Sequence, residues 1–167
     1  MSNLAYNLNY APLSNLDVVL FDNKPIKYRS VSIRSMPSIF SQNLPSGGTN
    51  VTRALKEELD SYFDRKKLQP ASNRPLVVAV ITDGAPSSAR SLKDLIIKAT
   101  HRLENRNQLK ISFLQIGQEN QGNRLLPELD NGLVNEGARL DIVDSKPFYE
   151  VQRKGLLEVL LDVVSTG

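Results

Sequence analysis

Short apolar runs alternate along this chain with longer segments of helical periodicity. The strongest strand signal is residues 75–82, PLVVAVIT, which are nearly all apolar or β-branched, as in strands buried on both faces. Residues 16–22, LDVVLFD, and 110–116, KISFLQI, predict two further strands, and 139–144, RLDIVD, predicts a short last one. Residues 26–33 are weaker and predict an edge strand antiparallel to the first.

Apolar residues at helical spacing predict the helices between these strands. They cover about residues 50–66, about 121–130 and 148–164, together with one that Ser87 or Ser88 caps and that runs to about Asn105; residues 38–41 predict a short helical turn. Alternation of helices and strands indicates one doubly wound α/β domain, with a mostly parallel sheet, helices on both faces and one antiparallel edge strand. Residues 1–15 form an atypical N-terminal segment of this domain of 167 residues.

Ligands of such sheets bind beyond the carboxyl ends of the strands. Four residues lie at the carboxyl ends of predicted strands: Asp22, Asp83, Gly117 and Asp144. The loop Gly47-Gly48-Thr49 leads into a helix, so we expect it on the same rim.

Composition excludes several classes of site. The chain has no cysteine, which excludes disulfides and thiolate metal sites and favours an intracellular, cytoplasmic protein. No apolar run approaches the roughly 20 residues of a membrane span. The formal net charge is +3 but the basic residues are scattered, so we expect no nucleic-acid partner. With His101 as the only histidine, most nucleophile–base pairs are unavailable, and we expect no enzyme.

Three segments in order carry a resemblance to a known family. They are Phe40–Leu55 (FSQNLPSGGTNVTRAL), Val77–Pro86 (VVAVITDGAP) and Ile111–Asp144, which contains FLQIG, LLPELDNGL and the start of DIVDS. Together they resemble the von Willebrand factor type A domain, a Rossmann-like fold, and in detail the intracellular variety common in fungi and some other microbes. The resemblance covers about residues 12–166.

The resemblance implies a metal-ion-dependent adhesion site that holds a divalent cation. The family's ligands come from an Asp-x-Ser-x-Ser motif, a Thr after a glycine pair and an Asp after a strand; Thr49 and Asp83 match the last two. No Asp-x-Ser-x-Ser exists in this chain, because the nearest pattern, Ser30-Val-Ser32, has Tyr28 in place of the Asp. We therefore expect a degenerate site with no cofactor, or Mg²⁺ bound weakly if another chain or an upstream segment completes the shell.

The same comparison implies that the family's first strand, which is central in its sheet, is missing or replaced. Its absence would leave unpaired backbone groups on LDVVLFD and LVVAVIT, which is costly inside a core. Three remedies are open. The two strands pair directly, residues Leu4–Tyr10 fill the gap, or another chain donates a strand, as a homo-oligomer or a strand-donating partner.

The predicted function is a protein-interaction module, acting as an adaptor or an assembly subunit. Its partner-binding rim comprises Asp22, Gly47, Gly48, Asn50 and Gly84. Structural roles compete with this one, because Thr49 or Asn50 can cap a helix and Asp83 can accept hydrogen bonds within its turn. The alternatives are a self-assembling subunit that uses exposed sheet edges and an α/β enzyme that holds a phosphorylated small molecule at Gly47-Gly48.

Overall fold

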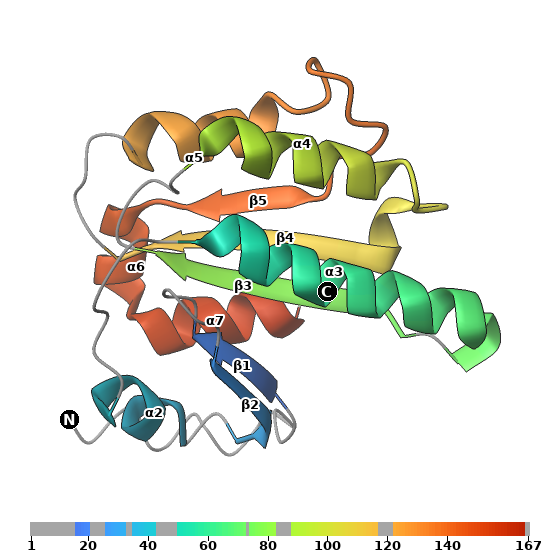
Figure 1. Ribbon diagram of the computed structural model, residues 1–167. Helices are drawn as coiled ribbons and strands as arrows, with labels where there is room; N and C mark the ends of the chain where they lie inside the picture. Colours follow the sequence, from blue (N-terminus) through green and yellow to red (C-terminus); the bar gives the residue numbers. More distant parts are fainter. Residues whose placement is uncertain are drawn as a thin grey trace. The chain divides into compact units, whose positions relative to one another are not determined.

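The protein has a mixed α/β structure in two compact units, Met1–Gly48 and Thr49–Gly167 (Figure 1). The computed structural model describes residues 16–20, 26–32, 35–42, 50–72, 74–82, 88–116 and 122–165.

The first unit contains a β-hairpin and a short helix. Strand β1 (Leu16–Leu20) pairs antiparallel with β2 (Ile26–Val31), and helix α2 (Met36–Gln42) follows. The predicted antiparallel pairing of these two strands is therefore confirmed, but among the described strands they form a two-stranded sheet of their own and not the edge of the parallel sheet. The register of the hairpin shifts at Asp17, whose carboxylate accepts a hydrogen bond from the Ser30 backbone N–H at 3.1 Å, and Ser30 takes a positive φ of 54°.

The second unit is built on a three-stranded parallel sheet. Its order is β3 (Leu76–Thr82), β4 (Leu109–Gln115), β5 (Val143–Lys146), so β4 is the central strand. This confirms a parallel sheet over the last three predicted strands, as their apolar runs indicated.

Direct pairing of LDVVLFD with LVVAVIT, the first remedy for the missing strand, stays a prediction. Among the described residues, β1 belongs to the two-stranded sheet and β3 to the three-stranded sheet. The second remedy, a strand over Leu4–Tyr10, lies outside the described residues. Donation of a strand by another chain stays a prediction.

Helices flank the three-stranded sheet (Figure 1). Helix α7 contacts β3, α6 contacts β4, α5 contacts β5, and α3 packs on α4. None of the described helices combines the length and the apolar character that crossing a membrane requires. The helices and the two 3₁₀ turns are α3 (Val51–Leu68), η3 (Pro70–Ser72), α4 (Ala89–Thr100), η4 (Arg106–Gln108), α5 (Gly122–Asn131), α6 (Phe148–Lys154) and α7 (Leu156–Ser165).

Side-chain caps fix where the longer helices begin. Asn50 precedes α3 and its Oδ1 accepts a hydrogen bond from the Arg53 N–H at 3.2 Å. Ser88 precedes α4 and its Oγ accepts from the Ser91 N–H at the same distance, which confirms the predicted cap. These bonds satisfy N–H groups that have no partner within the first turn.

The predicted end of α4 was wrong. The helix stops at Thr100 and does not reach Asn105, because Asn105 caps the next turn with its Oδ1 on the Asn107 N–H at 3.0 Å. His101 lies at the end of α4, and its Nε2 is 2.9 Å from the Gly137 carbonyl oxygen. The histidine therefore ties a loop to the helix end, which is a structural role.

Two further boundaries differ from the prediction. The last strand begins at Val143, because the Arg139 N–H donates to Thr100 Oγ1 at 2.9 Å and not to β4. The predicted helix over 148–164 is two helices, since Gly155 takes a φ of 91° and its N–H closes α6 on the Val151 carbonyl at 2.8 Å. Only glycine adopts that conformation without steric cost.

Candidate functional site

The predicted rim falls mostly on residues that the structure does not describe. Outside the described residues lie Asp22, Gly47, Gly48, Thr49, Asp83, Gly84 and Gly117. The metal site and the partner-binding rim therefore stay predictions, and the described part of the chain holds no cluster of three or more side chains suited to a metal. Asn50 is described, and it caps α3, which is the structural role set beside the binding role.

The carboxyl ends of β3 and β4 carry two buried polar side chains. Thr82 and Gln115 stand opposite each other in register, and they are 7% and 2% exposed. The prediction missed both, although a glutamine within an apolar strand was a signal that could have been used. They lie at the edge of the sheet where ligands of such folds are expected to bind.

Asp144 does not lie where the sequence placed it. It is inside β5, whose carboxyl end is Lys146, and its Oδ2 is 3.0 Å from Lys146 Nζ. The hydrogen bond to Asp144 is the largest cause of a raised pKa at Lys146. This carboxylate is thus engaged by a neighbour on its own strand, two residues away.

The outer edge of β3 is defined by the backbone groups that point away from β4. The Thr82 carbonyl accepts a hydrogen bond from the Ile116 N–H at 2.9 Å, so Thr82 faces β4. Because successive residues of a strand turn their backbone groups to opposite sides, Val77, Ala79 and Ile81 face outward. Among the described strands, β3 pairs with β4 alone, and these three residues form the outer edge of β3.

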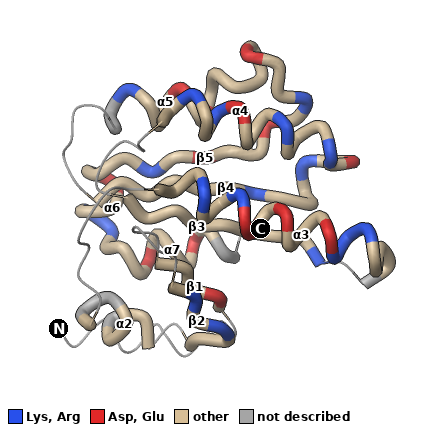
Figure 2. Tube along the Cα trace, in the orientation of Figure 1, with Lys and Arg blue, Asp and Glu red and all other residues tan. Residues whose placement is uncertain are grey.

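Nothing in the composition of β3 protects this edge. All seven residues are uncharged, so Figure 2 colours the strand tan throughout, and none is proline. Five of them are only half-buried, whereas β4, with a strand on each side, buries every residue except Lys110. An apolar, uncharged edge strand of this length readily pairs with another strand.

The opposite edge of the sheet is protected in three ways. The Ile111 N–H donates to the Ile142 carbonyl at 2.9 Å, so the backbone groups of Ile142 face β4. Because these groups alternate along the chain, those of Ser145, three residues later, face outward. Asp130 of α5 places its Oδ2 at 2.9 Å from both the Ser145 N and its Oγ, which occupies this edge. Strand β5 also has only four residues and is followed by Pro147. The two edges therefore differ sharply.

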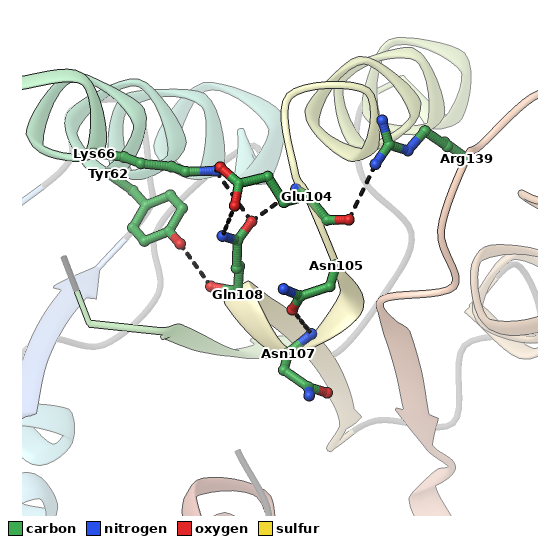
Figure 3. A network of polar contacts seen from close by, with 7 residues as sticks. All are labelled: Tyr62, Lys66, Glu104, Asn105, Asn107, Gln108 and Arg139. Carbon is green, nitrogen blue, oxygen red and sulfur yellow. Dashed lines mark hydrogen bonds and ion pairs between the residues drawn. The ribbon is translucent and has the colours of Figure 1, made fainter. Parts of the chain in front are cut away.

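A polar network joins α3 to the turn before β4 (Figure 3). Tyr62, which is 1% exposed, donates from its hydroxyl to the Gln108 carbonyl at 2.8 Å. Lys66 Nζ is 3.1 Å from both Gln108 Oε1 and Glu104 Oε1, and the Glu104 carbonyl accepts from Arg139 at 3.1 Å. These contacts hold the start of β4, which is the end opposite to the rim.

A groove of about 560 Å³ lies at the amino ends of the three strands. Its charged lining is Arg106, Lys110, Asp141 and Asp144, so it favours neither anions nor cations. We therefore do not place the functional site there.

Lys93 of α4 forms an ion pair with two carboxylates. Its Nζ is 2.7 Å from Glu136 and 2.9 Å from Glu128, and the hydrogen bond to Glu136, then that to Glu128, raises the pKa of Lys93 above 10.5. Because the pKa of Lys93 is higher in the folded than in the unfolded protein, the charged lysine stabilises the fold fully below pH 10.5. This stabilisation is lost as pH rises through the folded-state pKa.

We expect Lys93→Met to lower the free energy of unfolding by about 0.5–1 kcal/mol at neutral pH, since both carboxylates are partly exposed. Urea unfolding at neutral pH and at a pH above the raised, folded-state pKa of Lys93 measures this, and the difference from wild type should vanish at the higher pH. Lys98→Met, at an exposed lysine of the same helix, is the control. A difference that persists at high pH would show that the stem of Lys93, and not its charge, stabilises the fold.

Comparisons with known proteins do not supply a function. No protein-family model matches this chain, and no curated protein matches it. Any assignment therefore depends on the chain's own residues, among which the outer edge of β3 is the most distinctive described feature.

Proposed function

We propose that this chain is a protein-interaction module of the von Willebrand factor type A kind that accepts an extended segment of another polypeptide on the outer edge of β3. The observation that carries the proposal is the contrast between the two edges of the sheet. The edge of β5 is occupied by Asp130, whereas β3 offers an uncharged, half-buried strand.

Pairing at this edge uses backbone groups for affinity and side chains for selectivity. Val77, Ala79 and Ile81 each present one N–H and one C=O, and each hydrogen bond contributes about 0.5–1.5 kcal/mol net. A new strand would also cover apolar side chains of β3 that are now half-buried. The favoured ligand is therefore an extended segment with β-branched residues and no charge near its centre.

Such binding needs no metal ion, because the contacts are amide to carbonyl. We propose that Thr49 and Asp83 are the remnant of a metal site whose third group of ligands the chain lacks. Recognition at β3 is then the same with and without Mg²⁺.

A fluorescent peptide of alternating Thr and Val, of the same seven-residue length as β3, tests the proposal by anisotropy. We expect saturable binding that is equal in EDTA and in Mg²⁺. The same peptide N-methylated at every residue keeps its side chains but loses its donors, and it should bind about tenfold or more weakly.

Substitutions at Ala79 locate the site. Ala79→Pro removes an outward N–H, and its ring blocks the edge, so peptide affinity should fall; Ala79→Ser keeps the N–H and is the matched control. Binding that requires Mg²⁺ would refute metal independence. Binding that survives Ala79→Pro unchanged would place the site away from β3.

A further inference from the structure

We infer that the strand paired with β3 is β3 of a second copy of this chain, antiparallel, on a two-fold axis through Ala79. The inference rests on the proposed function, since both use the outer edge of β3. Two three-stranded sheets would then form one continuous six-stranded sheet.

Symmetry restricts which residues lie on the axis. A two-fold axis perpendicular to the sheet keeps each side chain on its own face, and residues that oppose each other must point to the same face. One residue of β3 must therefore oppose its own copy. Ala79 is the midpoint of Leu76–Thr82, so this register pairs the whole strand: Leu76 with Thr82, Val77 with Ile81, and Val78 with Val80.

The ends of β3 select the same register. With Ala79 on the axis, all the outward residues meet outward residues of the copy, namely Ala79 with Ala79 and Val77 with Ile81. Moving the axis to Val78 would oppose Ile81 to Pro75, which has no N–H to donate. Moving the axis to Val80 would oppose Val77 to position 83, which lies beyond the end of β3.

Charge does not oppose self-pairing. Like charges directly opposite each other destabilise a strand pair, and an identical strand always meets its own charges. Strand β3 has none over its seven residues, so the self-paired edge contains no repulsive contact. Side chains on both faces near the axis are valine and alanine, which pack without a polar group to desolvate.

Sedimentation equilibrium of the full chain tests the assembly. We expect a dimer that dissociates on dilution, with its dissociation constant raised about tenfold or more by Ala79→Pro. Ala79→Ser retains the N–H and should leave the dissociation constant nearly unchanged. Circular dichroism of each variant shows whether it is folded.

Cysteine cross-linking tests the register independently of affinity. The chain has no cysteine of its own, so Ala79→Cys introduces one thiol per copy. Opposed residues of a hydrogen-bonded pair have Cα atoms about 5.5 Å apart, within the range a disulfide spans. Val78→Cys is the matched control, because its two copies would be about 8 Å apart, too far for a disulfide. We expect oxidised dimer only from Ala79→Cys.

Failure of this inference is distinguishable from failure of the proposed function. A monomer at all concentrations that still binds the Thr/Val peptide would overturn self-pairing and leave strand acceptance intact. A monomer that binds no peptide, and whose Val77, Ala79 and Ile81 amides resist hydrogen exchange, would show that the same chain covers the edge and would overturn both. A dimer unaffected by Ala79→Pro, with no selective cross-link, would place the interface elsewhere.

Discussion

Phe113→Ala is expected to lower the free energy of unfolding by about 3–5 kcal/mol, the largest single effect among the changes considered. Phe113 lies in the central strand β4 and is 1% exposed. It stands between Val80 of β3 and Ser145 of β5, so the cavity left by the ring opens at the middle of the sheet. A rigid sheet collapses little around such a cavity, which places the cost in the upper part of the range.

Ser112→Ala is the matched control, on the same strand but on the other face of the sheet. The Ser112 hydroxyl is fully buried and has no hydrogen-bond partner within the described part of the protein. Removing it should stabilise the fold by up to about 1 kcal/mol. Urea unfolding followed by circular dichroism measures both variants. A loss below about 1 kcal/mol for Phe113→Ala would mean that β4 is not the centre of the core.

The sequence predicted the elements well where one periodicity dominates. The apolar runs LVVAVIT and KISFLQI became β3 and β4, and the Ser88 cap and the helical stripe from Val51 to Phe63 mark α4 and α3. Such signals are local, because each depends on residues that are close together in the sequence.

Boundaries set by distant contacts were not predictable. The last strand begins at Val143 because Arg139 bonds to Thr100, which is 39 residues away in the sequence. Gly155 divides α6 from α7 through a positive φ, yet its neighbours continue the helical stripe, so the apolar pattern concealed the break.

The candidate site shows the same limit. A fully apolar strand indicates burial on both faces of a sheet, but it does not say how many strands lie beside it. The pattern of β3 matches a central strand, whereas the structure places it at an edge among the described strands. That mismatch is the origin of the proposed function, and neither composition nor spacing alone could show it. Of the predicted rim, only Asn50 is described, as a helix cap.

Asp130→Ala is expected to lower the free energy of unfolding by about 1.5–3 kcal/mol. The substitution leaves the part-buried Ser145 N–H and Oγ without the carboxylate oxygen that accepts both at 2.9 Å. Hydrogen bonds to a charged acceptor are worth more than neutral ones, and a donor left without its acceptor costs its desolvation. Asp130→Asn keeps one oxygen at this position and should lose less than half as much. Urea unfolding of the three proteins gives the comparison.

The same variant separates two ways of protecting an edge. If Asp130 is the only feature that keeps other strands from pairing with β5, its loss opens a second edge of the sheet. Dimers joined at β3 would then add further copies at β5 and form an open-ended assembly. Strand β5 has only four residues, contains Asp144 and Lys146, and stops before Pro147. We therefore expect Asp130→Ala to be less stable but to keep the sedimentation mass of wild type. Assemblies larger than a dimer would show instead that Asp130 is what limits the assembly to two copies. Adding Ala79→Pro should then suppress these larger assemblies, because blocking β3 leaves each copy with only one edge that can pair.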